Sequence, residues 1–145
     1  MSIIVNFFVA PDHEAAAAVV GHGPEGVFET LVFGNFDASE AMIEWESIFT
    51  GRSFEELVDA DEPVVIADLD DGDGPTVFVA SEALRHALAA ADGVSLAEVC
   101  KLWVHGLAAE GEEFDLEIAI EILGDLARLA RGIDGRGDSL YCWTA

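Results

Sequence analysis

Apolar residues occur along the chain either in short continuous runs or in longer runs with a helical period. The short runs are rich in β-branched and aromatic residues, which favour β-strands. We expect strands at 3–9, 27–33, 64–67, 76–80 and 139–144. The last of these, SLYCWT, has apolar or aromatic side chains on both faces, which predicts a central position in the sheet.

Capping residues and helical periodicity predict the helices between these strands. Asp37 and Glu40 form a D-x-x-E capping pattern, and Gly51 ends the helix that follows. One face of this helix is apolar and consists of Ala41, Met42, Trp45, Ile48 and Phe49. Further helices are expected between Pro11 and Gly21, at 53–58, after Ser81, after a Ser95–Glu98 capping box, and at 116–131.

Together these elements predict one α+β domain over residues 1–145. A chain of 145 residues is long enough for one domain with a substantial core and short for two. We expect a small mixed or antiparallel sheet with paired terminal strands, packed by about five helices. The chain has only two cysteines, Cys100 and Cys142, and they are far apart in the sequence, so neither a disulfide framework nor a zinc site is indicated. Cys100 lies on an apolar helical stripe, which predicts a buried thiol and not a reactive one.

The charge of the chain limits its partners. It has 29 acidic and 6 basic residues, a formal net charge of −23, and 52% hydrophobic residues, which excludes a disordered chain. Such a surface repels nucleic acid and anionic membranes and attracts basic proteins or cations. The alternative interpretation is that the charge reflects coding bias and solubility. No signal peptide or membrane-spanning run is found, so a cytoplasmic protein is expected.

The sequence IADLDDGDGPT contains the densest group of carboxylates. Asp68, Asp70, Asp71 and Asp73 could bind calcium weakly, but no register supplies the ligands of an EF-hand. Asp-Gly pairs followed by proline between two strand-like runs are also typical of a hairpin turn. We therefore expect a turn, with a weak calcium site as the alternative.

Arg52 is the one basic residue among the first 84 residues. It could form a salt bridge with Glu55 or Glu56, or it could hold a carboxylate or phosphate group. A small-molecule site would then involve Arg52 and the end of the Trp45 helix, although Trp45 also lies on an apolar stripe. Glu40 and Glu44 share a helical face, where we expect solvent to screen them.

The segment EWESIFTG, with Trp45, Ile48, Thr50 and Gly51, resembles a segment of the YfbM-like family of small bacterial proteins of unknown function. The opening strand MSIIVNFF and the closing helix, turn and strand are similar in order to that family. Ile43 and Glu44 stand where a basic residue would be expected before the tryptophan. The resemblance implies an α+β fold and no activity.

No nucleophile elbow, phosphate-binding loop or metal-binding histidine spacing is found, so we expect no cofactor and no catalytic residue. The leading hypothesis is a non-catalytic interaction module that binds a basic protein. The alternatives are an anion-binding protein or enzyme at Arg52 and a weak calcium binder at 68–73.

Overall fold

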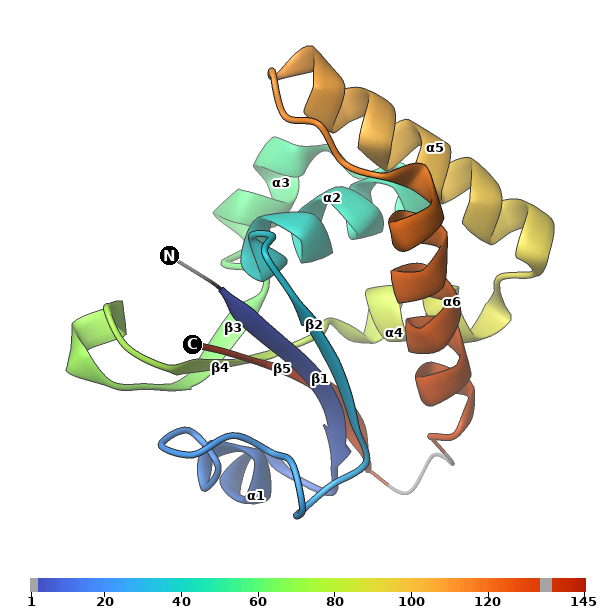
Figure 1. Cartoon of the computed structure of the whole chain (residues 1–145). Helices are drawn as coiled ribbons and strands as arrows, with labels where there is room; N and C mark the ends of the chain where they lie inside the picture. The colour runs from blue at the N-terminus through green and yellow to red at the C-terminus, as the bar shows by residue number, and fades with distance from the viewer. Residues whose placement is uncertain (1–2, 134–136) are drawn as a thin grey trace.

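The computed structural model describes residues 3–133 and 137–145, and its centre is an antiparallel sheet (Figure 1). The strands of the described residues are β1 (Ile4–Ala10), β2 (Thr30–Gly34), β3 (Val64–Asp68), β4 (Thr76–Val79) and β5 (Ser139–Thr144). Their order is β2-β1-β5-β4-β3. The terminal strands β1 and β5 pair, with Val5 opposite Thr144 and Ala10 opposite Ser139. The predicted α+β class and the pairing of the terminal strands are confirmed.

The central position of β5 follows from its side chains. Leu140, Tyr141, Cys142 and Trp143 are all buried, on alternating faces of the sheet. Leu140 and Cys142 belong to the larger core beneath the helices, whereas Tyr141 and Trp143 belong to the smaller core on the opposite face. A strand that is apolar on both faces is covered on both faces, as the sequence predicted.

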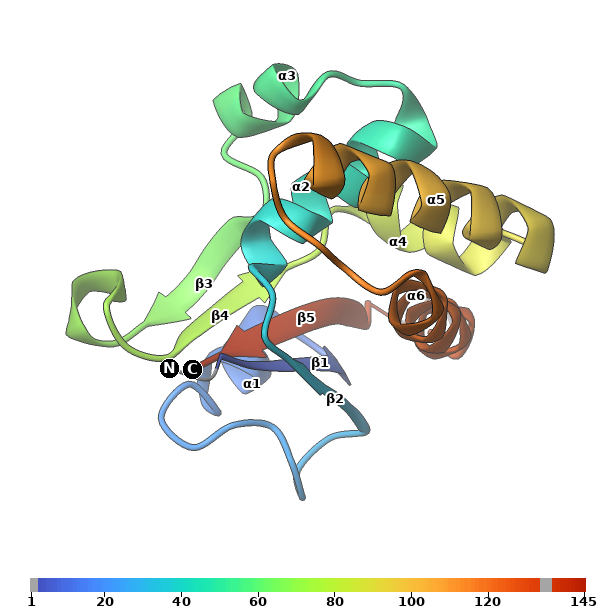
Figure 2. The ribbon, with the colours of Figure 1, turned by 45° about the horizontal axis from the view of Figure 1, so that its top comes forward.

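Helices cover the two faces of the sheet unequally, as Figure 2 shows. The described residues form α1 (His13–Ala17), α2 (Ala38–Thr50), α3 (Phe54–Asp59), α4 (Glu82–Ala90), α5 (Gly93–Ala109) and α6 (Leu116–Arg131). The larger core lies between the sheet and the layer that contains α2, α4, α5 and α6. The short α1 and the segment after it lie on the other face.

Two of the predicted helical boundaries are wrong. The carboxylate of Asp92 accepts a hydrogen bond from the amide of Ser95 at 2.8 Å, so α5 begins at Gly93 and Ser95 lies inside the helix. Asp92 is a good N-cap residue, and it precedes the predicted capping box by one turn. The first helix, expected to reach Gly21, ends at Ala17 and continues as turns.

Both cysteines lie in the larger core. Burial raises the pKa of the Cys100 thiol to about 11 and also raises the pKa of the Cys142 thiol. The buried thiol predicted for Cys100 is confirmed, and its raised pKa keeps it protonated near neutral pH. None of the helices formed by the described residues is long and apolar enough to cross a membrane.

Candidate functional site

Arg52 lies among carboxylates. Its guanidinium is 3.9 Å from Glu46 (Nη1 to Oε2) and 3.7 Å from Glu56 (Nε to Oε2). Burial and the charge of Glu46 raise the pKa of Glu62, and the nearby charge of Arg52 only partly offsets this. The predicted salt bridge to Glu56 is therefore present. Because three carboxylates surround the guanidinium, an anion would meet repulsion there, and the structure offers no support for the anion site.

Trp45 is placed in the core and not at a surface. Its side chain is 0% exposed, and its ring packs against Phe7, Phe36 and Trp103 with centroid distances of 6.1, 6.2 and 5.2 Å. The ring of Trp45 is not accessible to a ligand in this structure, and the ligand site at Trp45 and Arg52 stays a prediction. Its position on an apolar stripe indicated the core, and that interpretation is confirmed.

The acidic loop after β3 turns the chain into β4. The amide of Leu69 donates to the carbonyl of Pro75 at 3.0 Å, and the amide of Gly74 donates to the carbonyl of Leu69 at 3.1 Å. Asp70 and Asp71 both have a φ of 54°, the left-handed conformation that aspartate tolerates in turns. The predicted hairpin is confirmed. Within residues 3–133 and 137–145, the one close group of possible metal ligands is not in this loop. It consists of Glu40 and Glu44 of α2 together with Glu110.

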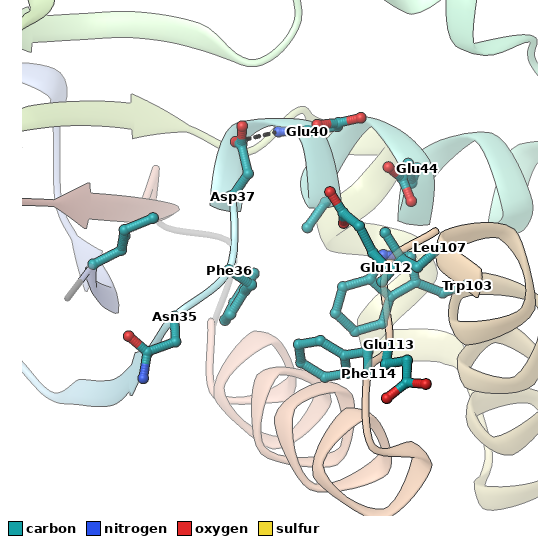
Figure 3. A pocket seen from close by; sticks show the side chains of 12 residues that line it. Asn35, Phe36, Asp37, Glu40, Glu44, Trp103, Leu107, Glu112, Glu113 and Phe114 are labelled. Atoms are coloured by element: carbon teal, nitrogen blue, oxygen red, sulfur yellow. Dashed lines mark hydrogen bonds between the residues drawn. The ribbon is translucent and has the colours of Figure 1, made fainter. Parts of the chain in front are cut away.

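A cleft of about 470 Å³ opens between α2 and the segment that joins α5 to α6 (Figure 3). We call it the acidic cleft. Its lining residues are Ile3, Asn35, Phe36, Asp37, Glu40, Ala41, Glu44, Trp103, Leu107, Glu112, Glu113 and Phe114. Aromatic rings form one wall: Phe114 packs on Trp103 at 4.8 Å and on Phe36 at 6.1 Å between centroids. Carboxylates form the other.

The start of α2 supplies one group of carboxylates. Asp37 caps the helix by accepting from the amide of Glu40 at 3.1 Å. Glu40 and Glu44 follow one helical turn apart, so their side chains point from the same face. The i, i+4 spacing thus places both carboxylates beside the cleft.

The end of α5 supplies the second group. Gly111 has a φ of 86°, its amide donates to the carbonyl of Ala108, and the amide of Glu112 donates to the carbonyl of Leu107. These two bonds form a Schellman motif, which turns the chain sharply after the helix. The turn places Glu110 and Glu112 opposite Glu40 and Glu44.

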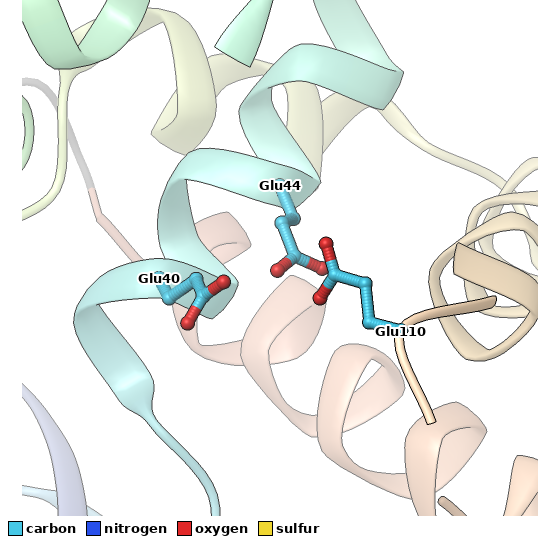
Figure 4. A group of neighbouring side chains, drawn as sticks. All are labelled: Glu40, Glu44 and Glu110. Carbon is cyan, nitrogen blue, oxygen red and sulfur yellow. The ribbon is translucent and has the colours of Figure 1, made fainter. Parts of the chain in front are cut away.

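Glu40, Glu44 and Glu110 form what we call the carboxylate cluster (Figure 4). One oxygen from each lies within 4.8 Å of the others. Burial raises the pKa of Glu44 to about 7, with further contributions from the charges of Glu40, Glu110 and Glu112. Burial also raises the pKa of Glu40, together with neighbouring negative charges that include Glu110 and Glu112. Near neutral pH Glu44 is therefore partly protonated, whereas an isolated glutamate would be ionised.

The sequence analysis did not identify this site. It treated Glu40 and Glu44 as a solvent-screened pair, but Glu44 is only partly exposed and faces Glu110. Glu110 lies 66 residues after Glu44, so no local pattern joins the two. Gly111 after an apolar helix predicts where the helix ends, but not which segment the turn will face.

The chemistry of the site suits positive charge. Three carboxylates at this spacing supply the oxygen ligands that hard divalent cations prefer. An ammonium or guanidinium group could form ion pairs with the same carboxylates and donate hydrogen bonds to them. In the aromatic wall, Phe36 and Trp103 are buried and Phe114 is partly exposed, so Phe114 offers the ring that a bound cation could contact.

Comparisons with protein-family models, with curated proteins and with solved structures find no match to this chain. The resemblance to the YfbM-like family therefore stays a prediction.

Changing Glu44 to glutamine tests the electrostatics of the cluster. Because folding raises the pKa of Glu44 from 4.5 to about 7, the folded state binds more protons than the unfolded state between these pH values. The stability from this group is fully present below pH 4.5 and is lost as the pH rises through 7. Glutamine does not ionise, so Glu44→Gln should match the wild type near pH 4.5 and exceed its unfolding free energy by about 1 kcal/mol at pH 8, after discounting for solvent screening.

Urea unfolding at both pH values measures this difference. Glu121→Gln on the exposed face of α6 is the control, and it should show no comparable gain at pH 8. Equal stability of Glu44→Gln and wild type at pH 8 would contradict the raised pKa.

Proposed function

We propose that the protein is a non-catalytic binding module that holds a cationic group of a basic partner protein in the acidic cleft. The observation that carries this proposal is the convergence of the carboxylate cluster beside an aromatic wall. Among the described residues that line the cleft there is no lysine, arginine or histidine. The carboxylates therefore have no cationic partner of their own in the cleft.

A bound cation would relieve the repulsion within the cluster. The free protein lowers this repulsion by keeping Glu44 partly protonated near pH 7. An ammonium or guanidinium group would favour the ionised form of Glu44, and the proton would leave as the cation binds. A cation can therefore interact with three ionised carboxylates in a site that partly excludes water.

The charge of the whole chain supports the same partner class. A net charge of −23 steers basic proteins toward the surface and accelerates their association at low salt. The acidic cleft would then provide the specific contact. A diffuse acidic surface alone would give attraction without a defined site.

A basic peptide tests this proposal. We would measure binding of a fluorescein-labelled seven-residue peptide, GKGKGKG, by fluorescence anisotropy, and we call it the lysine–glycine peptide. A triple variant changes Glu40, Glu44 and Glu110 to glutamine and should bind about 30-fold more weakly, equivalent to about 2 kcal/mol. The matched control changes Glu14, Glu25 and Glu29, exposed residues of α1 and the segment after it, to glutamine.

Both triple variants have a net charge of −20, three units less negative than −23. The control should therefore lose less than about threefold in affinity, because only long-range attraction changes. Equal losses in the two variants would show that the charge acts diffusely and would refute the proposal. Calcium or magnesium at millimolar concentration serves as a competitor and reports whether a divalent cation occupies the same cluster.

A further inference from the structure

A second hollow adjoins the acidic cleft. It has a volume of about 340 Å³ and lies between α2, α3 and α5. We call it the apolar hollow, lined by Ser47, Ile48, Phe54, Leu102, Trp103 and Gly106, with the carboxylate cluster at its edge. Glu40, Glu44 and Trp103 line both spaces. The two hollows therefore meet at the carboxylate cluster and form one groove.

Large apolar side chains stay exposed in this hollow. Leu102 on α5 is 54% exposed and Phe54 on α3 is 40% exposed. Ile48 on α2 is only partly buried. An apolar surface next to a group of carboxylates is complementary to a ligand that has an apolar group and a positive charge side by side.

We propose that this groove binds a basic peptide segment, with a large apolar side chain in the apolar hollow and an adjacent lysine or arginine at the carboxylate cluster. The inference rests on the proposed function and specifies the partner segment. A free polyamine or a metal ion would use the cluster and leave the apolar hollow empty. A second copy of this chain, with its net charge of −23, would be repelled.

Gly106 provides a way to fill the apolar hollow without disturbing the core. It lies inside α5, and a Cβ atom built there meets nothing within 4 Å. A leucine at this position would extend into the hollow. Since leucine favours the helix more than glycine does, Gly106→Leu should fold and melt no lower than the wild type. Gly124→Leu in α6, also with open space around Cβ, is the matched control outside the groove.

The experiment compares two labelled peptides. The first is the lysine–glycine peptide. The second has leucine in place of the glycine that follows the central lysine. The wild type and Gly124→Leu should bind the leucine peptide about tenfold more tightly than the first peptide. In Gly106→Leu the two peptides should bind with affinities within about twofold of each other, because the introduced leucine already fills the hollow.

Each other outcome has a defined meaning. If leucine in the peptide gives no gain in affinity for the wild type, or if the gain in affinity persists in Gly106→Leu, the inference is overturned and the proposed function stays intact. If the triple variant of the carboxylate cluster binds the lysine–glycine peptide as well as its matched control does, the proposed function itself is overturned. Circular dichroism of Gly106→Leu confirms that any lost gain does not come from unfolding.

Discussion

Replacing Trp45 by alanine is expected to lower the free energy of unfolding by about 4 kcal/mol, because it removes a large side chain from a packed core. Trp45 is fully buried and contacts rings from three other segments, Phe7, Phe36 and Trp103. Alanine would leave a cavity where the sheet, α2 and α5 meet, and the rigid elements around it cannot collapse fully. Urea unfolding followed by circular dichroism measures the loss.

Trp45→Phe is the control for this variant. The indole Nε1 of Trp45 is buried and has no hydrogen-bond acceptor among the described residues. Phenylalanine therefore loses volume but no hydrogen bond, and we expect a cost of about 1–2 kcal/mol. A loss below about 1 kcal/mol for Trp45→Ala would show that the ring is not part of a tightly packed core.

Replacing Glu46 by alanine is expected to lower the free energy of unfolding by about 3 kcal/mol, because it opens a cavity between α2 and α4 and removes the acceptor of the Ser81 hydroxyl. Glu46 on α2 is 3% exposed. The hydroxyl of Ser81 donates to its Oε1, while the same hydroxyl accepts from the amide of Leu84 and caps α4. The carboxylate of Glu46 thus joins α2 to the start of α4 and also faces Arg52.

Glu46→Met separates the loss of the network from the loss of volume. The second oxygen, Oε2, has no hydrogen-bond partner among the described residues and is 3.9 Å from Arg52. A buried carboxylate with one incompletely satisfied oxygen contributes little net stability, so methionine should stay within about 1 kcal/mol of the wild type. If Glu46→Met is as unstable as Glu46→Ala, the hydrogen bond from Ser81 to Glu46 contributes more to stability than the packing of the side chain does. A Glu46→Ala variant as stable as the wild type would contradict the expected cost of alanine.

The local features of the fold were predictable from the sequence. The β-branched runs become strands, although β2 begins at Thr30 and not at residue 27 as expected. The two-sided apolar pattern of SLYCWT becomes the central strand β5. The aspartate at 37 and the glycine at 51 begin and end α2 as expected. These features depend on residues a few positions apart, so propensity and periodicity describe them well.

The candidate site was not predictable in the same way. It depends on the turn at Gly111, which places Glu110 against Glu44 from a distant part of the chain. The i, i+4 pair of Glu40 and Glu44 is visible in the sequence, but partial burial and two further glutamates raise the pKa of Glu44. The partial burial of Glu44 and its proximity to the further glutamates both come from packing between α2 and α5, which local sequence patterns do not predict.

The central claim is that a basic partner binds in the acidic cleft and not to the acidic surface in general. Titrating ¹⁵N-labelled protein with the lysine–glycine peptide, and following the tryptophan indole signals by NMR, tests this claim most directly. Trp103 lines the acidic cleft, whereas the Nε1 of Trp143 donates to the carbonyl of Val20 on the opposite face of the sheet. We predict that the Trp103 signal shifts and saturates while the Trp143 signal stays in place. Equal small shifts of both signals without saturation, or no shift of Trp103, would contradict the account.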